Sequence, residues 1–172
     1  MASNIVLVGP MASGKSTVGA ALARRLSRPH VDTDHFFIAR NGPIGEYFLH
    51  RGEASFRAEE ERLVAELLDS PRPSVISLGG GAVLSAATRA LLKDHFVVML
   101  DVTEAQAEAR IGDAATRPVL TVDPAATPIQ RWKRIYAERL PLYQECVDLV
   151  VSSAEETIDA RVDTIVNSMK AR

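Results

Sequence analysis

Gly9-Pro10-Met11-Ala12-Ser13-Gly14-Lys15-Ser16-Thr17 fits the pattern G-x-x-x-x-G-K-[ST] at every fixed position. The apolar run at 4–8 before it predicts a buried strand, and the Ala-, Leu- and Arg-rich segment after it predicts a helix over 15–27. A helix that begins after a glycine-rich turn presents unpaired backbone N–H groups and the positive end of its dipole to an anion. We therefore expect a nucleotide phosphate site here rather than a chance glycine-rich turn. Lys15 can reach the β- and γ-phosphates, and the Ser16 hydroxyl can bind Mg²⁺.

The composition is that of an ordinary soluble protein. The chain has 172 residues, with 47% hydrophobic and 24% charged residues, and this length predicts one domain, 1–172. A net charge of −2 gives no electrostatic signal for nucleic acid or an anionic membrane. Because the single cysteine, Cys146, cannot form an internal disulfide, a reducing compartment is expected. Neither a signal peptide nor a membrane span is recognisable, so we expect a cytoplasmic protein.

Strand-like runs alternate with helical stretches along the chain. Strands are predicted at 5–8, 31–32, 74–78, 96–100 and 148–151, and helices at 15–27, 54–68, 85–92, 104–110, 128–144 and 155–169. Apolar strands that alternate with helices indicate an α/β fold, a doubly wound parallel sheet covered on both faces, with ligands at the carboxyl ends of the strands.

Two segments depart from this alternation. The segment 34–52 is interrupted by Asn41-Gly42-Pro43 and by Arg51-Gly52, which predicts a small helical insertion. The segment 111–127 is rich in Gly, Pro, Ala and Thr and reads either as a surface connection or as a mobile lid. Arg117 in this segment favours the lid, because a lid arginine can neutralise phosphate charge.

Acidic residues follow two of the predicted strands. In Val31-Asp32-Thr33-Asp34 an extended backbone would turn both carboxylates to one side, where Asp32 could hold Mg²⁺ through water and Asp34 could meet a substrate hydroxyl. The alternative for Asp34 is that it caps the helical run that follows it. Asp101, at the end of an apolar strand, is the second candidate for the Mg²⁺ carboxylate.

Glycines and arginines supply the remaining candidates. Gly79, Gly80 and Gly81 follow the third strand and allow close approach to a ligand and unusual φ values, although a tight turn alone would need only one glycine. Arg57 lies three residues before Glu60 on a predicted helix, so this carboxylate can orient the guanidinium. Arg139 and Arg57 are each suited to a two-pronged grip on a carboxylate or phosphate.

Taken in order, these motifs resemble the shikimate kinase family over about 4–151. The elements that carry the resemblance are Gly9–Thr17, Asp32-Thr33-Asp34, Gly52-Glu53, Phe56-Arg57 with Glu60, Gly79-Gly80-Gly81, Arg117-Pro118-Val119-Leu120 and Arg139-Leu140-Pro141-Leu142-Tyr143. The resemblance implies a three-layer αβα P-loop kinase, similar to nucleoside-monophosphate kinases, with a five-stranded parallel sheet in the order 2-3-1-4-5. It further implies a substrate-binding insertion at about 33–61 and a lid at about 111–125.

The implied reaction is transfer of the ATP γ-phosphate to the 3-hydroxyl of shikimate, with Mg²⁺ as cofactor, in a monomeric enzyme. The implied catalytic residues are Lys15, Asp34 and Arg117, and the metal would be held by Ser16 and, through water, by Asp32. The implied ATP contacts are Ala12, Ser13, Gly14, Lys15, Ser16, Thr17, Arg110 and Arg117. The implied substrate contacts are Asp34, Arg57, Gly79, Gly80, Gly81 and Arg139.

The chain departs from the family pattern at three places. Only Pro43 stands between Gly42 and Ile44, where two residues are expected. His35-Phe36-Phe37-Ile38-Ala39 follows Asp34 where the family has smaller residues, which keeps open a kinase of the same fold for another hydroxy acid such as gluconate. Ser152-Ser153-Ala154-Glu155 stands where many members carry an arginine near adenine, so backbone groups and Arg110 are expected to hold the base. A nucleotide-sensing module without catalysis is the alternative of another class, and Asp34, Arg57 and Arg139 argue against it.

Overall fold

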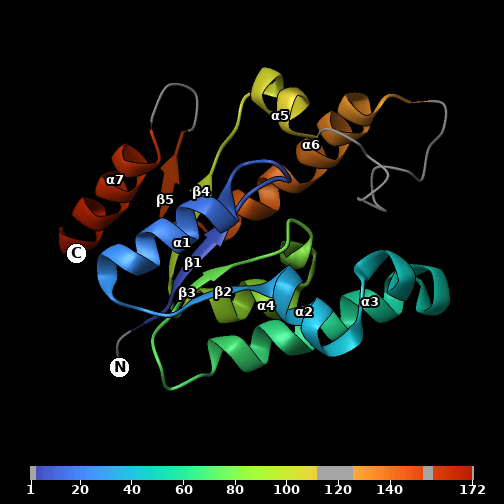
Figure 1. Ribbon diagram of the computed structural model, residues 1–172, viewed down its shortest axis with the longest axis horizontal. Coiled ribbons are helices and arrows are strands. Elements are labelled where there is room, and N and C mark those ends of the chain that lie inside the picture. Colours follow the sequence, from blue (N-terminus) through green and yellow to red (C-terminus); the bar gives the residue numbers. More distant parts are fainter. Residues whose placement is uncertain (1–2, 112–125, 153–156, 172) are drawn as a thin grey trace.

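The computed structural model describes residues 3–111, 126–152 and 157–171, and at the centre of this part of the chain lies a sheet of five strands in the order β2-β3-β1-β4-β5 (Figure 1). The strands are β1 (Ile5–Val8), β2 (His30–Asp32), β3 (Val75–Ser77), β4 (Phe96–Leu100) and β5 (Leu149–Val151). The pairs of neighbouring strands all run parallel. The predicted sheet and its strand order are confirmed.

The helices follow the predicted alternation, with ends that differ by a few residues. They are α1 (Lys15–Leu26), α2 (Thr33–Asn41), α3 (Ile44–Leu68), the short 3₁₀ helix η1 (Ala82–Leu84), α4 (Ala86–Leu92), α5 (Glu104–Ile111), α6 (Pro128–Cys146) and α7 (Ile158–Lys170). The predicted insertion consists of α2 and the first part of α3. Gly52 interrupts α3 with φ 77°, a left-handed conformation that favours glycine. In the described part of the chain, no helix has the length and apolarity that a membrane crossing requires.

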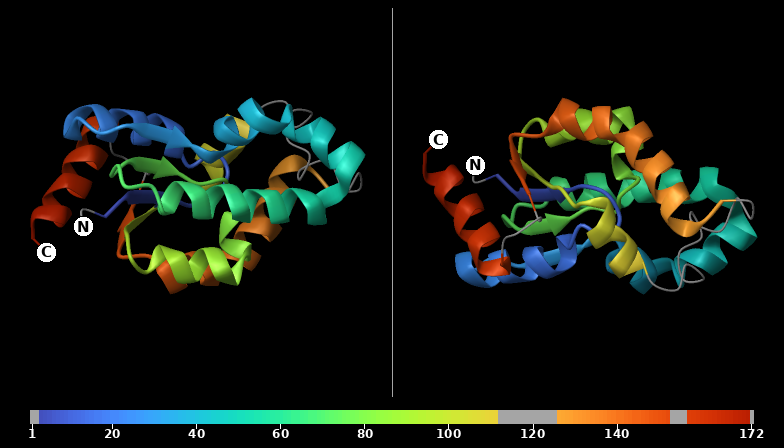
Figure 2. Two further views of the ribbon diagram at one scale, coloured as in Figure 1. Left: turned by 90° about the horizontal axis from the view of Figure 1, so that it is seen from below. Right: turned by 90° about the horizontal axis from the view of Figure 1, so that it is seen from above.

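Helices cover both faces of the sheet (Figure 2), and an apolar core lies on each face. Ile5 and Leu7 of β1 point into the core formed with α1 and α7, whereas Val6 and Val8 point into the core formed with α3, α4 and α6. All four side chains are at most 1% exposed. Because successive side chains of a strand alternate between faces, a strand that is apolar throughout has to be buried on both sides.

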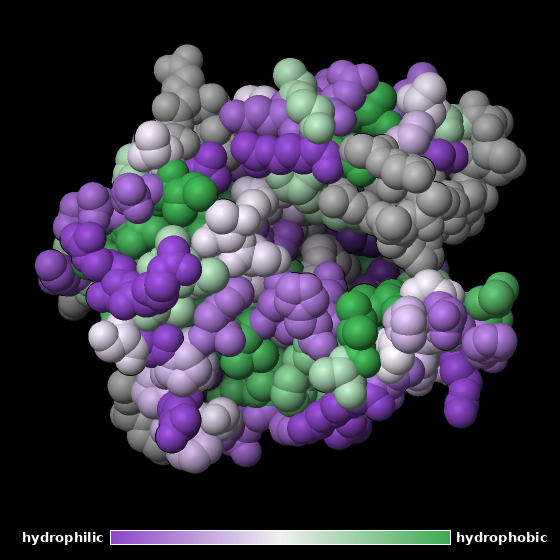
Figure 3. Space-filling model, in the orientation of Figure 1, coloured by the Kyte–Doolittle hydropathy of each residue, from purple (hydrophilic) through white to green (hydrophobic). Residues whose placement is uncertain are grey.

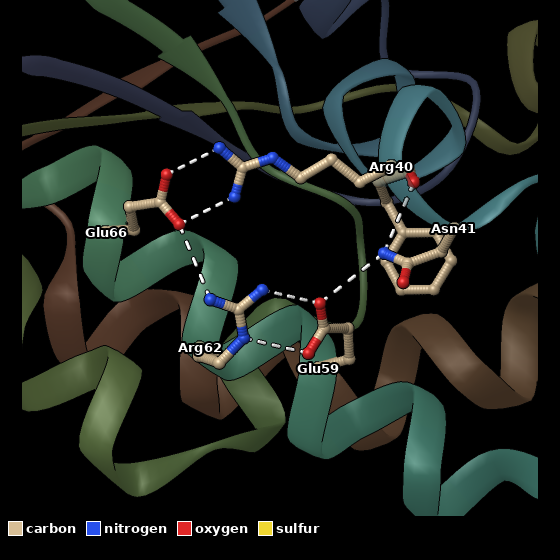
Figure 4. A network of polar contacts seen from close by, with 6 residues as sticks. Arg40, Asn41, Glu59, Arg62 and Glu66 are labelled. Carbon is tan, nitrogen blue, oxygen red and sulfur yellow. Dashed lines mark hydrogen bonds and ion pairs between the residues drawn. The ribbon is translucent and has the colours of Figure 1, made fainter.

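A polar network fastens α2 to the second half of α3 (Figure 4). Arg40 donates two hydrogen bonds to Glu66, each 2.7 Å long, and Asn41 donates one of 3.5 Å to Glu59. Arg62, on the same helix as both carboxylates, pairs with Glu59 at 2.7 Å and with Glu66 at 3.5 Å. Beneath this network the rings of Phe37, Tyr47, Phe48 and Phe56 pack together. The end of α2 and Phe37 in its middle are therefore held against α3.

Candidate active site

A cavity of about 390 Å³ opens at the carboxyl ends of β1, β2 and β3. The face of the molecule drawn in Figure 3 has a hollow near its middle. The lining residues are Met11, Ala12, Gly14, Lys15, Ser16, Thr17, Asp32, Asp34, Ile44, Phe48, Phe56, Arg57, Glu60, Leu78, Gly79, Gly80, Gly81 and Arg139. The sequence candidates Lys15, Asp34, Arg57 and Arg139 thus meet in one cavity, although they come from four different elements.

The phosphate loop forms one wall of this cavity. Gly9 has φ 139°, and a Cβ on it would lie 2.4 Å from the carbonyl oxygen of Leu100, so the loop leaves β1 where only glycine fits. Gly14, with φ 88°, is the N-cap of α1, and no side chain of the described residues caps this helix. The first N–H groups of α1 are therefore available to an anion. Lys15 folds back over the loop and donates from Nζ to the carbonyls of Gly9 (2.9 Å) and Pro10 (2.8 Å).

Asp32 joins the phosphate loop to α2. One carboxylate oxygen accepts a hydrogen bond from the Ser16 hydroxyl, and the other accepts from the backbone N–H groups of Asp34 (3.0 Å) and His35 (3.3 Å). The alternative reading in which Asp34 caps the helix is therefore wrong, because Asp32 is the N-cap. The expectation of an extended backbone through Asp34 is wrong as well, since β2 ends at Asp32 and Asp34 lies in the first turn of α2. Both carboxylates nevertheless line the cavity.

Asp101, the second candidate for the metal carboxylate, has other partners. Its Oδ1 accepts hydrogen bonds from the Tyr136 hydroxyl (2.7 Å) and from the backbone N–H of Val102 (2.8 Å), and it does not line the cavity. Asp32 therefore remains the carboxylate next to the Ser16 hydroxyl.

The surroundings of Asp34 make its carboxylate a stronger base than an ordinary aspartate. Its pKa is raised, first by desolvation among the groups around the cavity and second by the negative charge of Asp32. Lys15, His35 and Arg57 act in the opposite direction and moderate the rise.

Arg57 and Arg139 are held by different means. Arg57 donates from Nη1 to Glu60 at 2.6 Å, the contact that the i,i+3 spacing predicted, and it also reaches Glu53 at 3.4 Å. Burial raises the pKa of Glu60, while Arg57 lowers it. Arg139 is only 8% exposed and hydrogen-bonds to the hydroxyl of Tyr143, which in turn donates to the carbonyl of Gly80 at 2.6 Å. Burial raises the pKa of Tyr143 to about 12, so this hydroxyl keeps its proton.

The glycines after β3 line the cavity, as expected, but two of them also have a role within the protein that was not expected. None of Gly79, Gly80 and Gly81 has the positive φ that the sequence suggested. A Cβ on Gly79 would lie 2.7 Å from Asp34 Oδ1 and 2.8 Å from Glu60 Oε1, and a Cβ on Gly81 would lie 2.3 Å from Arg57 Nη1. Gly79 and Gly81 therefore make room for the protein's own charged side chains, although all three glycines also line the cavity.

Helix α6 contributes more to the site than its sequence revealed. We expected Trp132 and Tyr136 to be packing residues, and their rings do pack, with centroids 5.1 Å apart. In addition, Trp132 donates from its indole to the carbonyl of Met11 in the phosphate loop at 3.0 Å. With Arg139 and Tyr143 these residues stand at positions i, i+4, i+7 and i+11, so they form one stripe along the helix. This spacing is the signal that could have identified Trp132, Tyr136 and Tyr143 as one group.

The substitutions that set this chain apart after Asp34 lie outside the cavity. None of the residues from His35 to Ala39, all of which the structure describes, lines it. Phe36 and Phe37 pack instead into the aromatic cluster between α2 and α3. The apolar wall of the cavity comes from Ile44, Phe48 and Phe56, which sequence reasoning did not assign to the site.

Some sequence candidates lie elsewhere or outside the described residues. Ser13 is fully buried behind the loop and does not line the cavity. Arg110 lies outside the cavity too and donates to the carbonyl of Ala12 at 3.0 Å. Arg117, the segment 112–125 and the residues 153–155 are outside the described part of the chain.

Arg161 of α7 is a buried cation near the phosphate loop. It is 5% exposed, and its Nη1 lies 3.8 Å from the position that a Cβ on Gly14 would occupy.

Comparison with known proteins agrees with this geometry. The family model described as shikimate kinase matches residues 11–170. The chain is 42% identical to the shikimate kinase of Thermobifida fusca over 167 residues, which cover 96% of this chain and 94% of that protein. It is 44% identical to the shikimate kinase of Saccharopolyspora erythraea over 168 residues, 96% of this chain and 93% of that protein.

Comparison with solved structures also points to the shikimate kinases. A shikimate kinase from Acinetobacter baumannii, in complex with shikimate, superposes with a TM-score of 0.92 at 31% identity, covering 99% of this chain and 94% of that one. A gluconokinase from Sinorhizobium meliloti superposes with a TM-score of 0.66 at 20% identity, covering 98% of this chain and 92% of that one, a likeness of fold alone.

Proposed function

The chain belongs to the shikimate kinase family, and we propose that it transfers the γ-phosphate of ATP to the 3-hydroxyl of shikimate, which gives shikimate 3-phosphate and ADP. The observation that supports this proposal is the meeting of Lys15, on the phosphate wall, with Asp34, Arg57 and Arg139 in one cavity. Phosphoryl transfer depends mainly on positioning and charge neutralisation, and these four side chains supply both.

The donor half is the phosphate loop. The N–H groups from Ala12 to Thr17 would surround the phosphates, and Lys15 would exchange its contacts with the loop carbonyls for the β- and γ-phosphate oxygens. Arg117, carried by the lid that we propose at about 111–125, would add a second positive charge. Arg110, beside Ala12, is proposed to contact the adenosine end of ATP.

The residues present suit Mg²⁺. The Ser16 hydroxyl and the Asp32 carboxylate touch each other at the floor of the cavity, next to Lys15, and both offer oxygen. Mg²⁺ prefers oxygen ligands and keeps several waters, so it needs few protein groups. We propose that Ser16 binds the ion directly and Asp32 through water. Once bound, the ion would neutralise charge on the phosphate oxygens.

The acceptor half is the opposite wall. Arg57 and Arg139 would grip the carboxylate of shikimate, and the segment 33–61 that carries Arg57 is our proposed substrate-binding insertion. Asp34 would accept hydrogen bonds from the ring hydroxyls and take the proton of the attacking one. Gly79, Gly80 and Gly81 would border the ring, while Ile44 and Phe48 would cover its hydrocarbon face.

Gluconate is the second acceptor to consider, because a gluconokinase shares the fold. The apolar wall of Ile44, Phe48 and Phe56 favours a ring over an open polyhydroxy chain, whose hydroxyl groups would lose water without gaining partners there. A nucleotide sensor would have no use for a carboxylate clamp. We also propose that the enzyme acts as a cytoplasmic monomer, which is supported by a cavity that one chain lines by itself.

A coupled assay of ADP release tests the proposal. ATP-dependent turnover is expected with shikimate, and kcat/KM is expected to be at least about 10²-fold lower with gluconate, because a site that pairs buried polar groups discriminates strongly. Turnover that does not depend on shikimate would overturn the assignment, and ATP binding without any transfer to an acid would revive the nucleotide sensor.

A further inference from the structure

The imidazole of His30 lies behind the phosphate loop and takes no part in the site described above. Its Nε2 is 2.9 Å from the hydroxyl oxygen of Ser77, and that hydroxyl donates to the backbone carbonyl of Lys15 at 3.0 Å. Neither His30 nor Ser77 lines the cavity. A chain of two hydrogen bonds therefore runs from β2, through β3, to the first residue of α1.

The direction of these bonds follows from the number of protons available. A serine hydroxyl has one proton, and Ser77 gives it to the Lys15 carbonyl. The Ser77 oxygen can then only accept from His30, which requires a proton on Nε2. Both the neutral Nε2–H tautomer and the imidazolium carry that proton, so the arrangement does not depend on the charge of the ring.

The packing around this chain of bonds is tight. A Cβ on Gly19, one turn into α1, would lie 2.5 Å from the Ser77 hydroxyl oxygen and 2.6 Å from His30 Nε2. Only glycine lets the helix approach β3 closely enough for the Lys15 carbonyl to reach Ser77. Ser77 is 1% exposed, so loss of one of its partners cannot be made good by solvent.

His30 and Asp32 stand two residues apart on β2 and therefore point to the same face of the sheet. Asp32 binds the side chain of Ser16, and His30 acts through Ser77 on the backbone of Lys15. The same short strand thus holds two consecutive residues of the phosphate loop.

We propose that His30 is a positioning residue for the phosphate loop. Through Ser77 it fixes the backbone of Lys15, and in this way it sets the affinity for the phosphates of ATP. The inference rests on the phosphate role proposed for Lys15. It predicts that replacement of His30 changes the affinity for the nucleotide but not the affinity for the acceptor acid, because Arg57 and Arg139 lie on other elements.

Steady-state kinetics of three variants test this. His30→Phe removes the donor, Ser77→Ala removes the link, and His30→Gln keeps an N–H donor. We expect His30→Phe and Ser77→Ala to raise KM for ATP by on the order of 3- to 10-fold, as for one hydrogen bond, and His30→Gln to recover most of it. KM for shikimate should stay within about twofold in all three. His95→Phe is the matched control, because His95 is also half-buried but precedes β4 and does not line the cavity; its KM for ATP should not change.

The double variant His30→Phe/Ser77→Ala separates action through Ser77 from a general loss of stability. If His30 acts through Ser77, the double variant should match Ser77→Ala in KM for ATP. Additive effects, an unchanged KM in both single variants, or an equal rise in KM for shikimate would each overturn the proposal. A wild-type enzyme that binds no nucleotide would instead overturn the function proposed above.

Nuclear magnetic resonance gives a readout that does not need the variants to fold. With ¹⁵N-labelled histidine, the wild-type protein should show a protonated Nε2 on His30 at neutral pH. An Nε2 that carries no proton would contradict the proposal outright.

Discussion

Asp34 is the side chain with the most direct role in the proposed chemistry. Asn has the same shape but cannot take a proton, so Asp34→Asn is expected to lower kcat by on the order of 10²-fold or more. Because the substitution would keep the size of the side chain and the Asp32–Ser16 contact would remain, affinity for ATP should hardly change. Steady-state kinetics measure kcat, and ADP titration measures the affinity for nucleotide. A parallel loss of nucleotide binding would contradict the role proposed for Asp34 on the acceptor side.

The raised pKa of Asp34 gives the enzyme an acid limit. Only the ionised carboxylate can accept a proton, so kcat/KM should fall as pH decreases through the pKa of Asp34, and the midpoint should lie above that of an ordinary aspartate. Asp32→Asn removes the negative charge that raises this pKa, so the midpoint should move to lower pH even though activity drops. A pH profile of both proteins decides the point; an identical midpoint would exclude coupling between the two carboxylates.

Gly81 leaves the space that the guanidinium of Arg57 occupies, and a substitution that adds a Cβ tests this role. Gly81→Ala should push the Arg57 guanidinium aside, since the new carbon would come within 2.3 Å of Nη1 at the mobile end of that side chain. We expect KM for shikimate to rise roughly tenfold, as for one charge-assisted hydrogen bond, while KM for ATP stays constant. Arg57→Lys should do the same, because an ammonium lacks the two-pronged donor. If both variants leave KM for shikimate unchanged, the carboxylate clamp is wrong.

These residues also show where sequence reasoning reaches its limit. The place of Lys15 at the start of α1 and the contact between Arg57 and Glu60 were predicted correctly, because a loop motif and an i,i+3 spacing are local and fix geometry by themselves. The cap formed by Asp32 was not foreseen, since it depends on where β2 ends, and no local pattern fixed that boundary. The purpose of Gly79 was missed for another reason: Asp34 and Glu60, which need the space, are distant in sequence.

Helix α6 touches both halves of the site through different aromatic residues. Trp132→Phe keeps a ring but loses the bond to the Met11 carbonyl, so KM for ATP should rise a few-fold. Tyr143→Phe loses the bond to the Gly80 carbonyl beside Arg139, so KM for shikimate should rise instead. Kinetics of both variants against both substrates provide the test. Changes in the same substrate constant would mean that α6 acts only as scaffold.

The network between α2 and α3 is exposed and should contribute stability that depends on salt. Arg40→Gln replaces the two-pronged pair with Glu66, so Tm is expected to fall slightly at low ionic strength. The difference from wild type should shrink as salt is added, because exposed charges are screened. Calorimetry at two salt concentrations checks this, and a difference that persists in high salt would point to packing against Phe36 instead.

At the scale of the whole molecule, the alternation of apolar strands with helices predicted a parallel sheet, but the order of its strands was predicted only through the resemblance to the shikimate kinase family. The shape of the acceptor wall was not predicted, because Ile44 and Phe48 lie in the part of α3 before the break at Gly52, and the sequence does not fix the direction of that part. The unusual residues after Asp34 looked like a change of acceptor. None of them lines the cavity, and Phe36 and Phe37 pack between α2 and α3. The sequence could not show this, because it does not reveal which face of α2 meets α3.

The proposal places ATP and shikimate on different walls of the cavity, and thermal stability can test this separation. A ligand at 100 times its Kd stabilises the native state by about 2.7 kcal/mol. In Lys15→Ala, which should also lose at least about 10²-fold in turnover, the rise of Tm with ADP is expected to disappear while the rise with shikimate remains. Loss of both shifts would indicate that the variant has lost its fold at the cavity.

The stripe on α6 has a consequence for how this gene can change. Trp132, Tyr136, Arg139 and Tyr143 share one side of the helix only because the count of residues between them is fixed. One codon gained or lost in that interval would turn everything beyond it by about 100° around the helix axis. Substitutions on the solvent-facing side of α6 should therefore be tolerated. Insertions or deletions within α6 should be removed by selection, because they would break up the stripe.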